Sequence, residues 1–245
     1  MSVKKIALVT GGAGVMGTAV TRALVDEGTF VVIADYDQAA LEASTSHFGS
    51  DQVLALHMDV SKLADVIKGV RRIEREAGPV TILVNNAGVF SSSKAADTSE
   101  QEWRRVFSVN LDGAFFVSKA VLPGMRRVGW GRIINVSSYA AKSGGVTAGT
   151  AYAASKGGMI SLTFSLAAET VKQGITVNGI APAWVRTPMV TDLSETEQVR
   201  TINKIPVGRF CEPEEFAHVV RFLASDLSGF ITGEIVDLNG GVHFD

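Results

Sequence analysis

Short runs of β-branched and other apolar residues return along the chain, and longer amphipathic stretches separate them. Seven such runs predict strands, at residues 6–9, 30–34, 53–57, 81–84, 132–136, 175–180 and 234–238. Segments of helical length lie between them, among them 15–27, 38–48, 62–77 and 151–172. Because strands that are apolar on both faces and alternate with helices are typical of parallel sheets, the pattern predicts an α/β, doubly wound fold.

Nothing in the pattern divides the chain into separate units. It has no repeat of about 20 to 50 residues, no low-complexity tract and no linker rich in Pro or Ser. We therefore predict a single domain over residues 1–245. The longest stretch outside a strand–helix unit, about 183–212, is expected to form a lid over a site, and a mobile surface loop is the alternative.

Charge and cysteine content narrow the function classes. The chain has 23 Lys and Arg against 25 Asp and Glu, a net charge of −2, which leaves no basic surface for nucleic acid. Its single cysteine, Cys211, forms neither an intramolecular disulfide nor a thiolate metal cage, so we expect an inert thiol in a reducing cytoplasm. The four histidines lack metal-site spacing, and we expect no metal.

The apolar runs are also too short for membrane or export signals. The run after Lys5 ends at Thr10, which is short for the apolar region of a signal peptide. No other run approaches the roughly 18 apolar residues that a membrane helix needs. We therefore expect a cytoplasmic protein without a membrane partner.

A glycine-rich turn follows the first predicted strand. Thr10 and Gly11 lead into a segment that contains Gly12, Gly14 and Gly17, and a helical pattern follows at once. Glycines at such a turn let backbone N–H groups approach a pyrophosphate at the positive end of the helix. A tight turn without any ligand is the alternative.

An acidic residue at the end of the second predicted strand supports the ligand. Asp35 stands where a carboxylate accepts both ribose hydroxyls of an adenosine and repels a 2′-phosphate. No Lys or Arg occurs between Gly11 and Thr21 to hold such a phosphate. The sequence therefore predicts NAD in preference to NADP. Asp37 is the competing acid, and it is expected to cap a helix.

Polar residues also follow the third and fourth predicted strands. They are Asp59-Val60 and the segment Asn-Asn-Ala-Gly at 85–88. The carboxyl ends of parallel strands line the ligand crevice, so these residues are expected to hold the adenine edge and the middle of the cofactor. The alternatives are a helix cap near Ser61 and ordinary turn chemistry.

The candidate catalytic residues are Ser138, Tyr152 and Lys156. Tyr152 and Lys156 are four residues apart in a helical segment, so they project from one face. A nearby ammonium group favours a phenolate and is expected to lower the phenol pKa, so that the oxygen exchanges a proton near neutral pH. Ser138 follows a strand, where its hydroxyl can reach a substrate oxygen. A surface Tyr–Lys pair is the alternative.

Neighbouring residues offer weaker candidates for the same roles. Tyr139 and Lys142 are three apart in a loop rich in Gly, Ser and Ala, and Ser137 adjoins Ser138. Only Lys156 and Glu169 are charged between residues 151 and 171, so this helix is not an ordinary solvated one. Its apolar coverage on more than one face indicates subunit packing.

In chain order, these motifs, together with Asn110 and the segment 182–187, resemble the short-chain dehydrogenase/reductase family over nearly the whole chain. The resemblance implies a Rossmann-type domain with seven parallel strands, usually assembled as a tetramer. It further implies hydride transfer between a nicotinamide and a carbonyl or alcohol carbon.

The resemblance also assigns roles to individual residues. Tyr152 is the general acid/base, Lys156 lowers its pKa and binds the nicotinamide ribose, and Ser138 orients the substrate oxygen. Asn110 holds a water that relays protons to Lys156. The cofactor-binding residues that it implies are Gly11, Val15, Met16, Gly17, Asp35, Tyr36, Asp59, Val60, Asn86, Ala87, Gly88, Tyr152, Lys156, Pro182, Val185 and Thr187.

The chain departs from the family pattern at two positions where glycine is usual. Val15 is expected to disturb the turn, because a β-branched residue resists positive φ and its Cβ points toward the pyrophosphate. Ala183, after Pro182, is expected to stiffen the nicotinamide end of the site.

The sequence thus predicts an NAD-dependent oxidoreductase that acts on a secondary alcohol or its ketone. One alternative is an NADPH-dependent 3-oxoacyl-thioester reductase, which Asp35 disfavours. Another is a dinucleotide-binding sensor or scaffold without chemistry, and a third is a methyltransferase; neither needs Tyr152 and Lys156. Substrate specificity is expected to lie in residues 140–149 and 184–205.

Overall fold

Seven parallel strands form one sheet in the computed structural model, which describes residues 4–244. The strand order is β3-β2-β1-β4-β5-β6-β7. The strands are β1 (Ile6–Thr10), β2 (Phe30–Asp35), β3 (Val53–His57), β4 (Ile82–Asn85), β5 (Gly131–Val136), β6 (Ile175–Pro182) and β7 (Ile235–Leu238). All seven predicted strands are confirmed to within two residues. Residues 1–3 and 245 of the predicted domain lie outside the described residues.

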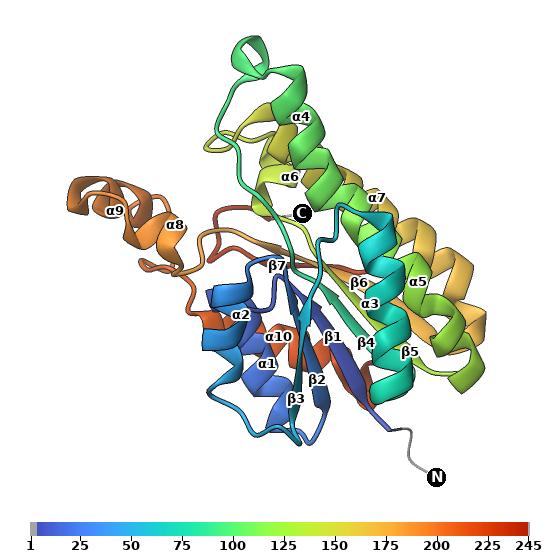
Figure 1. The fold of residues 1–245 in the computed structure, drawn as a ribbon. Helices are drawn as coiled ribbons and strands as arrows, with labels where there is room; N and C mark the ends of the chain where they lie inside the picture. The colour runs from blue at the N-terminus through green and yellow to red at the C-terminus, as the bar shows by residue number, and fades with distance from the viewer. Residues whose placement is uncertain (1–3, 245) are drawn as a thin grey trace.

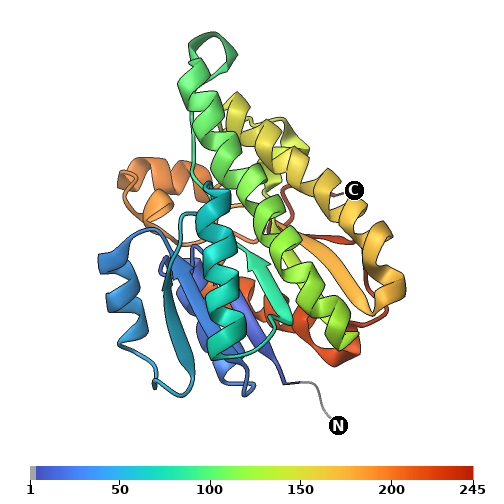
Figure 2. The ribbon, with the colours of Figure 1, turned by 45° about the vertical axis from the view of Figure 1, so that its right-hand side comes forward.

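Helices cover both faces of this sheet (Figure 1). They are α1 (Val15–Val25), α2 (Gln38–Thr45), α3 (Leu63–Glu76), α4 (Glu100–Phe107), α5 (Gly113–Val128), α6 (Tyr139–Ser143), α7 (Thr150–Thr170), α8 (Pro188–Thr191), α9 (Glu195–Ile202) and α10 (Pro213–Ala224). Figure 2 shows α3, α5 and α7 side by side over one face. Helices α1, α2 and α10 pack on the other face.

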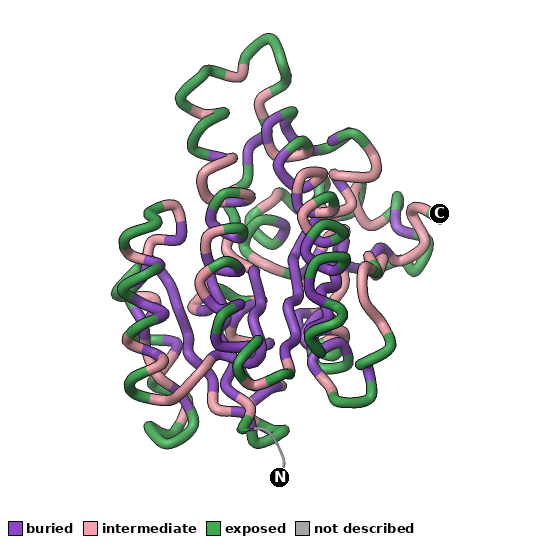
Figure 3. The backbone as a smooth tube through the Cα atoms, turned by 90° about the vertical axis from the view of Figure 1, so that its right-hand side faces the viewer, coloured by how far each residue is buried: buried purple, intermediate pink, exposed green. Residues whose placement is uncertain are grey.

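Alternation along the strands explains the two layers of helices. In β1, Ile6 and Leu8 join the core under α3, α5 and α7, whereas Ala7 and Val9 join the core under α1, α2 and α10. The strands are therefore buried on both faces, and they form the buried centre of the molecule in Figure 3. Burial on both faces explains why strands were predicted here from largely apolar runs and not from an alternation of apolar and polar residues.

The order of the strands reverses between β1 and β4, because β2 and β3 follow on one side of β1 and β5, β6 and β7 follow on the far side of β4. Thr10 at the end of β1 pairs with Asn85 at the end of β4, and the chain leaves these two strands toward opposite faces. In doubly wound sheets, ligands bind in the crevice at such a switch point. The glycine-rich turn and the Asn-Asn-Ala-Gly segment therefore meet at one place.

The segment between β6 and α10 has helices of its own, α8 and α9, which project away from the sheet in Figure 1. Its apolar residues form a separate small cluster around Val190, Ile205 and Phe210, against which Trp184 and Val242 pack. The segment therefore has its own packing and is not an irregular loop.

One helical stretch within residues 4–244 differs from the expectation that no run is long enough to cross a membrane. Residues Glu100–Val128 pass a test of length and mean hydropathy. Core helices pass the same test, and this stretch contains α5, whose Val117, Val121 and Met125 lie in the core. Length and composition are therefore weak evidence for a membrane span.

Candidate active site

Close packing makes three glycines of the first turn necessary. Gly11 has a φ of +59°, in the left-handed region that favours glycine. A Cβ on Gly17 would lie 2.4 Å from the Gly11 carbonyl oxygen, and one on Gly12 would lie 2.8 Å from Val9 O. The turn thus folds back on itself and presents backbone at the start of α1, where the helix dipole favours an anion. This geometry fits the pyrophosphate of a dinucleotide.

Val15 does not strain this turn as expected. It is the first residue of α1, and no described residue other than glycine has a positive φ. Gly14 before it caps the helix at φ −72°, a conformation open to any residue. The expectation that Val15 needs a positive φ is therefore wrong, because the chain is already helical at that position. Its side chain is 43% exposed.

Asp35 and Asp37, the two acids that the sequence offered for ribose binding, make different contacts. The Asp35 carboxylate accepts hydrogen bonds from the backbone N–H of Ala13 and of Asp37, each at 3.2 Å. It is therefore held against the glycine-rich turn. Asp37 caps α2, because its side chain accepts from Ala40 N–H at 3.1 Å. Of the two acids, only Asp35 is placed beside the turn.

The segment after β4 is tied to the turn after β1. Asn86 Nδ2 donates to the carbonyls of Thr10 (3.0 Å) and Gly11 (2.9 Å), and Thr10 Oγ1 accepts from the N–H groups of Asn86 and Ala87. A Cβ on Gly11 would lie 2.8 Å from Ala87 Cα, so glycine is needed on the other side as well. These contacts build one wall of the crevice.

Asp59 behaves differently from Asp35. Its carboxylate accepts from Ser61 N–H (3.0 Å) and Ser61 Oγ (2.6 Å), and it pairs with Lys62 at 3.1 Å. Burial raises the pKa of Asp59, but these partners outweigh burial and the pKa lies below its usual value. Its side chain thus stabilises the turn before α3 but does not cap that helix, whose N-cap residue is Lys62 without a side-chain cap, while Val60 packs under Gly113. Tyr36 is largely exposed beside this edge of the sheet.

Ser138, Tyr152 and Lys156 meet at the carboxyl end of β5. They line one cavity of about 160 Å³. The other predicted residues on its lining are Met16 of α1, Asn86 and Gly88 after β4, Pro182 at the end of β6, and Val185 and Thr187 after it. Lys156 is 3% exposed, and its Nζ donates to Val136 O at 2.7 Å. The Ser138 Oγ accepts from Ala140 N–H, so this serine also caps α6. The predicted residues from five parts of the chain thus share one cavity.

Burial controls the protonation of the Tyr–Lys pair. It raises the pKa of Tyr152, and a hydrogen bond with Ser138 offsets only part of this effect. It lowers the pKa of Lys156 to about 8. The expectation that Lys156 lowers the pKa of Tyr152 is therefore wrong for this structure, because desolvation of the phenolate dominates. A phenol that stays protonated at neutral pH is suited to donate a proton.

Asn110 lies in an irregular helical turn beside Lys156. It is fully buried in the π-helical turn Ser108–Asp112 between α4 and α5. Its side chain accepts from Val89 N–H (2.8 Å) and donates to Val89 O and Ser155 Oγ (both 3.1 Å). A Cβ on Gly88 would meet both Lys156 Nζ (3.3 Å) and Asn110 Oδ1 (3.4 Å). Such π-helical turns occur frequently at functional sites.

Of the weaker candidates, Tyr139 and Lys142 lie outside this cavity, whereas Ser137 lines it. Lys142 pairs with Asp237 of β7 at 2.6 Å, and the Tyr139 ring lies 6.0 Å from the Trp184 ring. Ser137 Oγ donates to Lys156 O and is buried. Because neither Tyr139 nor Lys142 lines the cavity, the structure favours Tyr152 and Lys156 over this pair.

The sequence reasoning missed Val89 and Phe90, which both line the cavity. Phe90 stacks edge-on against Tyr152, with ring centroids 5.2 Å apart. The two residues follow the Asn-Asn-Ala-Gly segment directly, and that position was the only available signal. Cys211 lies outside this cavity, and burial raises the pKa of its thiol to about 11, which makes it unreactive as expected.

Taken together, the site can bind a dinucleotide across the β1–β4 switch and can exchange a proton at a substrate oxygen. The glycine turn fits the pyrophosphate, Asp35 fits the ribose, and the Ser138–Tyr152–Lys156 cavity fits the reacting end.

Comparisons with known proteins agree with this chemistry. Residues 11–243 match the family model described as enoyl-(acyl carrier protein) reductase. The chain is 40% identical to an acetoacetyl-CoA reductase of Rhizobium meliloti, covering 98% of this chain and 99% of that protein. It is 37% identical to nodulation protein G of Azospirillum brasilense (98% and 99%). It is 36% identical to a 3-oxoacyl-[acyl-carrier-protein] reductase of Vibrio harveyi (98% and 97%).

Proposed function

The chain belongs to the short-chain dehydrogenase/reductase family, and we propose that it reduces the ketone of a 3-oxoacyl thioester. It is an oxidoreductase that acts on ketone or alcohol groups. The meeting of Ser138, Tyr152 and Lys156 in one cavity carries the proposal for the chemistry. The relatives' names support the substrate, because an acetoacetyl group is itself a 3-oxoacyl group. They favour the thioester alternative over a general secondary alcohol.

Protonation of the site supports the reducing direction. Because the pKa of Tyr152 is raised by burial, its hydroxyl is protonated at neutral pH and can donate that proton to the ketone oxygen. The Ser138 hydroxyl orients the same oxygen. Lys156 holds the nicotinamide ribose, and Asn110 places a water for reprotonation. When bound, the nicotinamide supplies the hydride.

For the cofactor we propose NADH. The thioester alternative that the sequence raised was NADPH-dependent, but the Asp35 carboxylate beside the glycine-rich turn supports NADH, because a carboxylate there can accept the ribose hydroxyls and repels a 2′-phosphate. The glycine turn offers no cation to hold such a phosphate, since residues 11–21 contain no Lys or Arg. Substrate class and cofactor thus rest on separate observations and can be tested separately.

The proposed reaction is tested with acetoacetyl-CoA and either NADH or NADPH, followed by absorbance of the reduced nicotinamide. We expect turnover with NADH, and a loss of at least about 100-fold in kcat for Tyr152→Phe, the scale of general acid catalysis. The dissociation constant for NADH, measured by calorimetry, should stay within about threefold, because the phenol oxygen contributes little to binding. A Tyr152→Phe enzyme that keeps a tenth of the wild-type rate contradicts the assignment.

We also propose a cytoplasmic homotetramer that binds neither nucleic acid nor membrane. Support comes from α7, where the buried residues form one stripe and Phe164, on another face, is 49% exposed. Phe115 on the adjacent α5 is 42% exposed. Two large apolar side chains on neighbouring helices are typical of subunit contacts. Mass photometry that finds only a 25.9 kDa species contradicts this proposal.

A further inference from the structure

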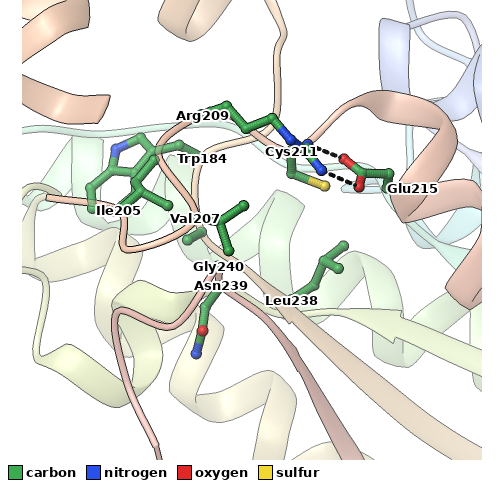
Figure 4. Close-up of a pocket in the computed structure, with 10 residues that line it drawn as sticks. Trp184, Ile205, Val207, Arg209, Cys211, Glu215, Leu238, Asn239 and Gly240 are labelled. Atoms are coloured by element: carbon green, nitrogen blue, oxygen red, sulfur yellow. Dashed lines mark hydrogen bonds and ion pairs between the residues drawn. The ribbon is translucent and has the colours of Figure 1, made fainter. Parts of the chain in front are cut away.

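A second cavity lies directly behind the catalytic one. It has a volume of about 140 Å³ and is lined mostly by apolar residues from the segment after α9 and from the end of β7, with Arg209, Glu215 and Asn239 also on its lining (Figure 4). Only Ala183 and Trp184 line both cavities. The two spaces are thus separated by a wall one residue thick.

The backbone of this wall is fixed. Cys211 N–H donates to Trp184 O at 2.9 Å, and Arg186 N–H donates to Cys211 O at 2.8 Å. On the far side of the second cavity, Arg209 forms two hydrogen bonds with Glu215 (Figure 4). Because the main chain is held at these points, the Trp184 side chain decides whether the two spaces are joined.

The indole of Trp184 is well packed in its closed position. It packs against the small apolar cluster that contains Ile205, and Figure 4 shows the two side chains beside each other at one end of the cavity. On its other side it lies 6.0 Å from the Tyr139 ring. Tyr139 directly follows Ser138, so this contact links the wall to the catalytic serine.

The volumes limit what each cavity can hold. A cavity of about 150 Å³ is known to accept a benzene ring, which has six carbons. The catalytic cavity is of this size, so a long acyl chain does not fit in it without further space. The second cavity would hold about six further carbons.

We propose that Trp184 sets the chain length of the substrate, by closing the catalytic cavity against the apolar cavity behind it. This inference rests on the proposed function. The wild-type protein then prefers acetoacetyl-CoA over longer 3-oxoacyl thioesters. Replacement of the indole joins the two cavities and admits a longer tail.

The test compares kcat/KM for 3-oxobutanoyl-CoA and 3-oxodecanoyl-CoA. We expect Trp184→Ala to raise the ratio of the long to the short substrate at least tenfold, since each buried methylene contributes about fourfold. Trp184→Phe keeps an aromatic wall and should leave the ratio within about threefold. The double variant Trp184→Ala/Cys211→Leu refills the second cavity and should cancel the gain. Cys211→Leu alone should not change the ratio, because the wall is closed.

Two controls keep the outcomes distinct. Val199→Ala changes an exposed residue of α9 and should leave the ratio of the long to the short substrate unchanged. If Trp184→Ala fails to fold, Trp184→Leu is used in its place. If the wild type reduces no thioester with either cofactor, the proposed function is wrong, and the same variants are compared on butan-2-ol and decan-2-ol. A ratio that Trp184→Ala or its Leu substitute does not move, or that Cys211→Leu alone moves, overturns the proposal.

Discussion

The Lys156 ammonium is buried, and burial destabilises its charged form. This has a measurable effect on the stability of the fold. The residue is 3% exposed, and burial lowers its pKa to about 8 from the usual 10.5. The unfolded chain therefore binds a proton more tightly than the folded chain. Between these two pKa values, the free energy of unfolding rises as pH rises.

The size of the effect follows from the pKa difference. A difference of about 2.5 units corresponds to about 3 kcal/mol between the two protonation states. Below the pKa of Lys156 in the folded state, its charge destabilises the fold by the full amount. This destabilisation disappears once the pH exceeds the pKa of Lys156 in the unfolded chain. Between about pH 7 and pH 9.5, roughly 2 kcal/mol of it should be recovered.

The assay is urea denaturation of the wild type and of Lys156→Met at both pH values. Methionine fills a similar volume without a charge, but it leaves Val136 O without its 2.7 Å donor, so the absolute stabilities are less informative than their change with pH. We expect the stability of the wild type relative to Lys156→Met to increase by about 2 kcal/mol from the lower to the higher pH. A difference that stays constant, or that falls, refutes the reasoning that Lys156 is desolvated.

Two further predictions concern the cofactor crevice. Gly17→Ala would place a Cβ 2.4 Å from the Gly11 carbonyl oxygen. It should cost about 1–3 kcal/mol of stability, measured by urea denaturation, and at least tenfold in NADH affinity, measured by calorimetry. Gly14→Ala is the matched control, because the nearest atom to its Cβ would lie at 3.6 Å. Asp35→Ala should weaken NADH binding and move the kcat/KM ratio toward NADPH by at least tenfold, whereas Asp37→Ala should lose only a helix cap of about 1 kcal/mol. An unchanged cofactor preference in Asp35→Ala would contradict the role of that carboxylate.

The fold was predictable because a buried parallel sheet leaves a simple pattern. The central strands have both faces covered, so most of their positions are apolar and the runs stand out between amphipathic helices. The boundaries were harder to predict, since β1 extends to the polar Thr10 and β6 extends to Ala181 and Pro182 at the crevice. The helices α8 and α9 escaped prediction because they are short and their apolar residues serve a local cluster.

The candidate catalytic residues could be predicted from the sequence, but their ionisation could not. The spacing of Tyr152 and Lys156 placed both on one helix face, as the structure confirms for the cavity they share. Spacing carries no information on how deeply a group is buried, and burial decides both pKa shifts. The positions of Phe90 and Trp184 beside the cavity could not be predicted from the sequence either, because cavity shape depends on contacts between segments that are distant in sequence.

A buried polar network explains how β5 and α7 bring the catalytic groups to the same place. Asn135 on β5 accepts from Asn85 of β4 at 2.8 Å and donates to Thr163 of α7 at 2.9 Å. Apolar contacts alone would let a helix shift along a sheet, whereas these hydrogen bonds are directional and costly to break in a buried position. Ser137 adds a link to the Lys156 carbonyl at 2.8 Å. The polar residues within this core therefore set the register of α7 against β5, and Ser138 meets Tyr152 as a consequence.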